Sequence, residues 1–165
     1  MSMRTRGRKA LLTAATITAA LSLAAVTPSL AGTGATHTDR ATAAHGDPRD
    51  VTQRVADFYG AYIDSVWDSE SPAAAANAKA LRSFYLSPEA RRKAAAYEAK
   101  EHADGILFAQ NVPVEWKVAY TGSGAGHATS RVTLTWGDGR HAQVTEIDVQ
   151  SDLKTRRITD LRQAG

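Results

Sequence analysis

A chain of 165 residues without cysteine can form no disulfide, so its fold must be held together by packing alone. The same absence excludes a cysteine nucleophile and a lipid-anchored cysteine. The 20 Lys and Arg residues exceed the 17 Asp and Glu residues by three, and this small excess comes from the N-terminus.

The first 31 residues have the three parts of a secretory signal peptide. Four basic residues and no acidic one lie among the first nine, an uncharged run spans residues 10–26, and small side chains stand at Ser29 and Ala31. A transmembrane anchor would need about 20 strongly apolar residues, whereas this run is shorter and is diluted by threonines. We therefore expect cleavage after Ala31 and release of a secreted, extracellular protein that has no membrane contact once the signal is removed.

Removal of the signal peptide changes the charge of the protein. The mature chain keeps 16 Lys and Arg residues against 17 Asp and Glu residues, a net charge of −1. Nucleic-acid binding rests on clustered cations that neutralise phosphates. The basic run at residues 91–93 lies in a predicted helix and is interpreted as a solvated face. We therefore expect no nucleic-acid partner.

The mature chain divides into a leader and one domain. Residues 32–46 consist mostly of Gly, Thr, Ala, His and Asp with no apolar period, which predicts a disordered leader. Residues 47–165 are enough chain for a single domain with a buried core.

Three helices are expected, and each opens with a capping side chain directly before a proline. The expected helices span residues 48–67, 72–84 and 88–102, and they begin at Asp47-Pro48, Ser71-Pro72 and Ser87-Pro88. The first helix carries apolar residues at spacings of three and four, which gives it one apolar face. These residues are Val51, Val55, Phe58, Tyr59, Tyr62 and Val66.

After residue 105 the apolar period changes to two, which indicates strands. Alternating segments occur at residues 114–120, 131–136 and 145–150, and a less regular, bulged strand is expected at 153–161. Short connections of Gly, Asp and Ser specify antiparallel hairpins. One face of this sheet is apolar and the other charged, so helices should cover one side only. The fold class is therefore α+β, with three N-terminal helices packed on one face of a curved four-stranded antiparallel meander.

Two short motifs carry a resemblance to a known family. They are the segment Phe58-Tyr59-Gly60-Ala61-Tyr62 and the stretch from Asp104 to Val118, which contains Ala109-Gln110-Asn111 before a strand. Over residues 50–162 the chain resembles a group of uncharacterised exported bacterial proteins in the nuclear-transport-factor-two-like superfamily of cystatin-type α+β cones. It departs from that group at Gly105, where the group has proline, and at Asn111, where the group has aspartate. The resemblance implies a cone-shaped domain that can pair as a homodimer, and it implies no particular activity.

The sequence contains no catalytic motif, so no catalytic residue and no cofactor are expected. It has no Gly-x-Ser-x-Gly, no phosphate-binding glycine loop and no His-Glu-x-x-His. The five histidines are scattered, whereas a metal site needs three or four converging ligands, so no metal is expected either. A buried Asp general base would suit a cone. However, Glu146 and Asp148 alternate with Ile147 and Val149 and should face away from the core.

Polar and aromatic side chains predicted to point into the cone are the candidate ligand-binding residues. They are Tyr59, Tyr62, Tyr120, His141 and Gln143, with Trp116 and Trp136 as walls. Such a mouth would suit an apolar or carbohydrate-like ligand, and the same residues would equally form an ordinary aromatic core. The sequence favours a domain that binds a small molecule or a protein in or beside this cone. The alternatives are a small hydrolase, isomerase or dehydratase with its active site in the cone, and a module that interacts or dimerises through its sheet.

Asp104, Gln110 and Asn111 are structural candidates. Asp104-Gly105 is typical of a helix exit, with Gly105 supplying the left-handed end. Gln110 and Asn111 are expected to bind backbone groups where the chain crosses from helix to sheet.

Export is directly testable. Mass spectrometry of the culture supernatant should show a mature form that starts near Gly32, because small residues precede this position. Full-length chain retained in the membrane would contradict this prediction.

Overall fold

The computed structural model describes residues 46–68 and 70–165, which all belong to one compact unit. The expected signal peptide and all but the last residue of the expected leader lie outside the described residues. Within the described ranges, no helix has the length and apolar character needed to cross a membrane.

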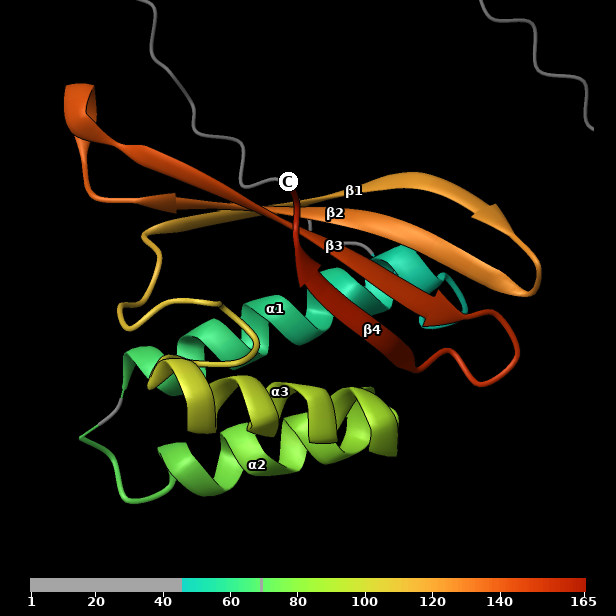
Figure 1. The fold of residues 1–165 in the computed structure, drawn as a ribbon, viewed down its shortest axis with the longest axis horizontal. Helices are drawn as coiled ribbons and strands as arrows, with labels where there is room; N and C mark the ends of the chain where they lie inside the picture. Colours follow the sequence, from blue (N-terminus) through green and yellow to red (C-terminus); the bar gives the residue numbers. More distant parts are fainter. Residues whose placement is uncertain (1–45, 69) are drawn as a thin grey trace, which may run out of the picture. The chain divides into compact units, whose positions relative to one another are not determined.

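Three helices precede four strands (Figure 1). The helices are α1 (Val51–Trp67), α2 (Ala74–Tyr85) and α3 (Pro88–Glu101), and the strands are β1 (Glu115–Gly124), β2 (His127–Trp136), β3 (Gln143–Asp152) and β4 (Ile158–Gln163), with the short 3-10 helix η1 (Gly139–His141) after β2. The strands pair in chain order, each antiparallel to the next. The expected α+β fold class is confirmed, and the sheet is open.

Two of the three expected helix starts are displaced by a few residues. α1 is capped by Asp50, whose carboxylate accepts hydrogen bonds from two amides of the first turn at 2.7 and 3.1 Å, while Asp47 pairs with Arg49. α2 begins after Ala73 and has no side-chain cap. α3 starts as expected, because Ser87 Oγ accepts a hydrogen bond from a first-turn amide at 3.1 Å. The prolines therefore lie shortly before α1 and α2, and only in α3 is the proline the first helical residue.

The strands are longer than their alternation predicts, because the turns between them are tighter. Gly122 and Gly124 were expected in a turn, yet they continue β1, and the hairpin closes through Ala125 and Gly126. Both of these residues have positive φ angles, 50° and 81°, as a two-residue turn of type I′ requires.

A register shift in the last hairpin explains the irregular alternation of β4. Ser151 pairs with Ile158 and Gln150 pairs with Asp160, so β4 contains one extra residue at this step. Ile158 is buried, and Leu161 packs against the same core although it lies three residues later. The expected bulge is confirmed.

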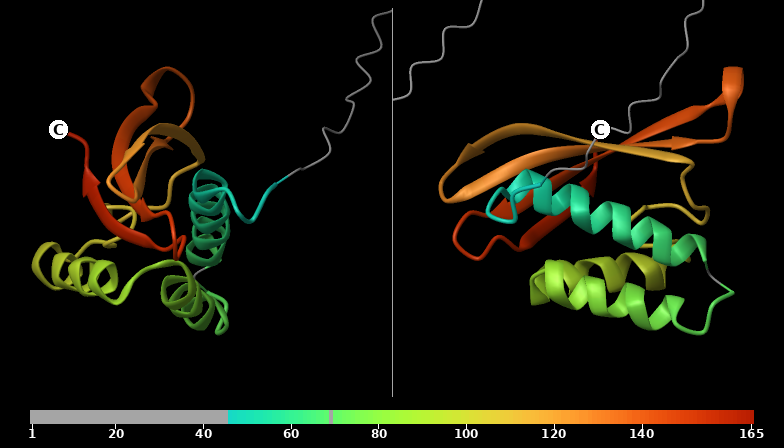
Figure 2. Two further views of the ribbon diagram at one scale, coloured as in Figure 1. Left: turned by 90° about the vertical axis from the view of Figure 1, so that its right-hand side faces the viewer. Right: turned by 180° about the vertical axis from the view of Figure 1, so that it is seen from behind.

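The helices cover one face of the sheet and leave the other face open (Figure 2). Alternate side chains of β2 and β3 are buried beneath the sheet; they are Val132, Leu134, Ile147 and Val149. On the open face, Arg131 lies between Glu146, at 3.2 Å, and Asp148, at 2.9 Å. The predicted parity of β3 is correct, and it keeps both carboxylates out of the core.

Gly105 has a different role from the one expected. The left-handed residue that ends α3 is His102, with a φ angle of 53°. A Cβ atom at Gly105 would lie 2.4 Å from the carbonyl oxygen of Ala94 in α3. Because this neighbour is main chain, it cannot move aside, so glycine is needed here for close approach of the loop to the helix.

Gly105→Ala should therefore lower the free energy of unfolding by about 3 kcal/mol, at the upper end of the usual cost of overpacking. Gly124→Ala is the matched control, since a Cβ atom at that position would meet nothing within 4 Å, and it should change stability by less than about 0.5 kcal/mol. Urea unfolding of both variants gives the comparison. Equal losses would mean that the loop does not pack against α3.

Candidate functional site

The Asp104 carboxylate organises the loop that leads from α3 to β1. Its Oδ1 accepts hydrogen bonds from the amides of Ile106, at 2.7 Å, and Leu107, at 2.9 Å. Its Oδ2 accepts hydrogen bonds from the Tyr62 hydroxyl, at 2.5 Å, and from Nη2 of Arg82, at 3.0 Å. A single side chain thus shapes the loop and ties it to α1 and α2.

Arg82 extends this junction to α3. Its Nη1 lies 2.6 Å from Oε1 of Glu98, and the same oxygen accepts a hydrogen bond from the Gly105 amide at 3.0 Å. The guanidinium also donates to the Tyr62 hydroxyl and lies 5.2 Å from the centre of the Tyr62 ring. Every charged group in this junction has an opposite charge beside it, as partly buried ions require.

The other two structural candidates contribute less than Asp104. Gln110 Nε2 donates one long hydrogen bond, 3.4 Å, to the carbonyl oxygen of His102. Asn111 is exposed, and its side chain makes no hydrogen bond within the described residues. Asp104 therefore fixes the crossing from helix to sheet.

Tyr59 and Tyr62 lie in the core, at 0% and 1% exposure. The hydroxyl of Tyr59 donates to the carbonyl oxygen of Ile106 at 3.3 Å. Burial, followed by the nearby Asp104 carboxylate, raises the pKa of both phenols well above the ordinary value. Their rings fill the space beneath the sheet, which favours the aromatic core that the sequence also allowed over a ligand site.

Tyr120, His141 and Gln143 are exposed, so they do not line an enclosed interior. Tyr120 keeps the inward parity of β1 but is 57% exposed, and its hydroxyl donates to Ser123 at 2.8 Å. His141 and Gln143 belong to the β2–β3 hairpin, which extends beyond the helices in Figure 1. An inward position in the alternation of a strand therefore does not guarantee that the side chain is buried.

Trp116 and Trp136 are half-buried and pack against the edge of the core. The Trp116 ring lies directly on Gly60 of α1, where a Cβ atom would come within 2.8 Å of its Cζ2. Trp136 donates its indole N–H to Oγ1 of Thr145 at 2.9 Å.

A surface hollow of about 300 Å³ lies beside Trp116. We call it the tryptophan hollow, and its lining consists of Ile63, Asp64, Trp67, Pro113, Val114 and Trp116. Trp67, at the end of α1, is 61% exposed, and Val114 is 48% exposed. Sequence reasoning missed Trp67, although it follows Ile63 by one helical turn, a spacing that places both on one side of α1.

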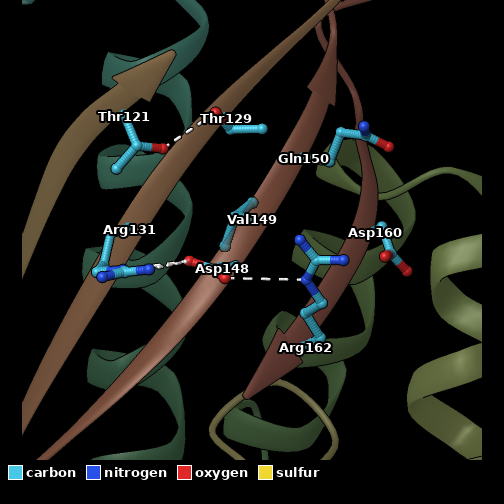
Figure 3. A pocket seen from close by; sticks show the side chains of 8 residues that line it. All are labelled: Thr121, Thr129, Arg131, Asp148, Val149, Gln150, Asp160 and Arg162. Atoms are coloured by element: carbon cyan, nitrogen blue, oxygen red, sulfur yellow. Dashed lines mark hydrogen bonds and ion pairs between the residues drawn. The ribbon is translucent and has the colours of Figure 1, made fainter. Parts of the chain in front are cut away.

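A second hollow, of about 310 Å³, lies on the open face of the sheet (Figure 3). Its charged side chains pair with one another: Nη2 of Arg131 lies 2.9 Å from Asp148, and Nε of Arg162 lies 3.8 Å from the same carboxylate. Threonines complete a wall of the hollow. Because these charges are already compensated, this hollow offers a ligand less than the tryptophan hollow does.

Metal chemistry finds no support in the part of the chain that the structure describes. Within residues 46–68 and 70–165, no three His, Asp or Glu side chains are grouped so that they could hold a metal ion.

Comparisons with known proteins give information about the fold and none about the function. No protein-family model matches the chain, and no curated protein matches it. Among solved structures, a protein of unknown function from Bacteroides thetaiotaomicron is similar, with a TM-score of 0.57 and 20% identity over 68% of this chain and 88% of that one. This likeness supports the arrangement of helices and strands.

The two buried tyrosines predict a loss of stability at alkaline pH. Their folded-state pKa values are raised, so their contribution is complete below the unfolded-state pKa, about 10, and is lost as pH rises above it. The free energy of unfolding should fall there by up to about 1.4 kcal/mol per pH unit for each tyrosine. Urea unfolding at pH values on both sides of 10 measures this slope.

Lysines also titrate in this range, so the informative quantity is the difference in slope between wild type and Tyr62→Phe. The variant should lose stability less steeply above pH about 10. Identical slopes would show that the Tyr62 phenol is not held protonated by the fold.

Proposed function

We propose that this chain is a secreted binding domain of the nuclear-transport-factor-two-like superfamily, and that it holds a small ligand in the tryptophan hollow. The order of helices and strands and the motif at residues 58–62 support the family assignment. The N-terminal pattern of charge and apolar residues supports export. The ligand lies beside the core and not inside it.

The filled interior favours a site beside the core. Phe58, Tyr59, Tyr62, Leu134 and Ile147 occupy the space between sheet and helices, and each is at most 1% exposed. A ligand could enter only by displacing these close-packed side chains, which would cost several kcal/mol. The tryptophan hollow needs no such rearrangement.

The exposed Trp67 is the observation that carries the proposal. Trp67 and Trp116 line the same hollow, and the exposed residue Asp64 is part of the same lining. Indole rings offer flat apolar faces, and an exposed carboxylate accepts hydrogen bonds from hydroxyl groups. This combination suits a small ligand with one apolar face and several hydroxyl groups, as in a sugar ring. The volume lies at the lower end of the range for small-molecule sites.

Binding is favoured over catalysis at this position. Asp64 is the one titratable side chain among the residues that line the hollow, whereas acid–base chemistry on a sugar or a carbonyl compound needs a second positioned group. The half-buried carboxylate of Asp104 is occupied by four hydrogen bonds.

Tryptophan fluorescence, titrated with a panel of monosaccharides, oligosaccharides and small aromatic compounds, tests this function. A ligand that binds the hollow should change the emission saturably, and Trp67→Ala should weaken its binding about tenfold or more, as expected for an aromatic anchor. Because Trp67 is exposed, this variant should keep its stability within about 0.5 kcal/mol.

Tyr120→Ala is the matched control, since it removes a similarly exposed aromatic ring that does not line the hollow. It should leave binding unchanged. Trp116→Ala, in contrast, should lower the free energy of unfolding by about 2–4 kcal/mol, because its ring packs against α1. If no compound binds and Trp67→Ala instead dissociates a dimer, the hollow is a protein interface and the sheet-module alternative is favoured.

A further inference from the structure

Four arginines from distant parts of the sequence meet at the end of the domain remote from the tryptophan hollow. Here α1 begins, α2 ends, α3 begins and the β3–β4 turn returns to the sheet (Figure 1; left view of Figure 2). We call Arg54, Arg91, Arg156 and Arg157 the arginine cluster. Since Arg54 and Trp67 stand 13 residues apart on α1, the two sites are roughly 20 Å apart along the helix.

Two members of the cluster converge on a single serine. Nη1 of Arg157 donates to the carbonyl oxygens of Ser83, at 3.2 Å, and Leu86, at 3.1 Å. Nη1 of Arg91 lies 3.4 Å from Oγ of the same Ser83. Two guanidinium groups therefore contact the same residue at the end of α2.

The other two members lie against aromatic rings and main chain. The guanidinium carbon of Arg54 is 5.3 Å from the centre of the Phe84 ring and 5.0 Å from that of Tyr85. Its Nε donates to the carbonyl oxygen of Arg156 at 3.3 Å, and Arg156 in turn donates to Pro48 at 3.5 Å. The cluster is continuous from α1 to the β3–β4 turn.

No carboxylate lies within 4.0 Å of the four guanidinium groups in the described part of the chain. Nearby acidic side chains are engaged elsewhere: Asp50 caps α1, Asp47 pairs with Arg49, and Asp152 accepts hydrogen bonds from the amide and hydroxyl of Thr155. Arg49, and to a smaller extent Arg156, lowers the pKa of Asp47, so Arg156 has a carboxylate in its vicinity. Arg54, Arg91 and Arg157 have no such partner, and a bound anion would reduce the repulsion among them.

One buried donor in the cluster has no partner. The Nε–H of Arg91 is inaccessible to solvent and makes no hydrogen bond within the described residues, an arrangement that is costly for a charged group. A purely structural role accounts for Arg157, because a cation stabilises the C-terminal carbonyls of a helix. It does not account for Arg54 and Arg91, which reach the same last turn of α2 from α1 and from α3.

We propose that the arginine cluster is a binding site for a phosphate group. Guanidinium groups present planar pairs of N–H donors that match the oxygens of phosphate, and they keep their charge at any physiological pH. Phe84, which is 59% exposed and borders the cluster, provides an apolar surface for the molecule that carries the phosphate. Because the domain as a whole is close to neutral, the site attracts one compact anion and not a long nucleic acid.

Titration of the isotope-labelled full chain with inorganic phosphate, against sodium chloride at equal ionic strength, tests the proposal by NMR. Saturable shifts should appear in the arginine Nε–H signals of the cluster and in the amides of residues 83–86. Arg91→Gln should weaken phosphate binding about tenfold, the usual effect of removing a charge-assisted hydrogen bond. Arg92→Gln, which removes the same charge from the next, exposed position of α3, should weaken it less than about twofold.

Thermal unfolding of both variants establishes that they fold, and Arg54→Gln replaces Arg91→Gln if the latter does not. Sedimentation with phosphatidylcholine vesicles that contain phosphatidylglycerol separates two sources of the group. Arg91-dependent sedimentation assigns the phosphate to a lipid, whereas phosphate binding without sedimentation assigns it to a soluble compound. Shifts that do not saturate, or equal weakening by Arg91→Gln and Arg92→Gln, would overturn the proposal. Neither result bears on the tryptophan hollow.

Discussion

The Asp104 carboxylate is the group on which the arrangement of the helices depends most. Its two oxygens accept hydrogen bonds from the hydroxyl of Tyr62, the guanidinium of Arg82 and two amides of its own loop. Many exported domains of this size use a disulfide to tie such segments together, but this chain has no cysteine. The junction also positions both surface sites. The loop that it shapes continues to Pro113 in the tryptophan hollow, and Arg82 belongs to the last turn of α2, which ends at the arginine cluster.

The sheet could be predicted almost completely from the sequence, because each buried face is encoded in neighbouring residues. Ile147 and Val149 alternate with Asp148 and Gln150, and this local pattern is sufficient to assign faces and hairpins. The junction at Asp104 could not be predicted in the same way. Tyr62 and Asp104 are 42 residues apart, and nothing in the local sequence of either residue specifies the other. Gly105 illustrates the same limit, since the reason for a glycine there is the main chain of Ala94, not the conformation of Gly105 itself.

The candidate sites were predicted only in part, because alternation identifies the face of a side chain but not what covers that face. Tyr120 has the parity of Trp116, yet its side chain is 57% exposed. Tyr59 and Tyr62 point inward as expected and are covered so completely that no ligand reaches them. Trp67 could be recognised as a candidate binding residue only from the structure, which places the end of α1 beside the start of β1. The arginine cluster is still less visible in the sequence, since its members come from two helices and a turn.

The missing N-terminal cap of α2 has a consequence for the dynamics of the domain. Most of the first turns of this helix, from Ala73 to Asn77, are exposed, and only Ala74 among them is buried. The other end is held by Arg82 in the Asp104 junction and by Arg157 on the carbonyl oxygens of Ser83 and Leu86. Resistance to local opening therefore rises along α2 from its start to its end. We expect the amide protons of its first turns to exchange with solvent through fraying, and those of its last turn to exchange more slowly.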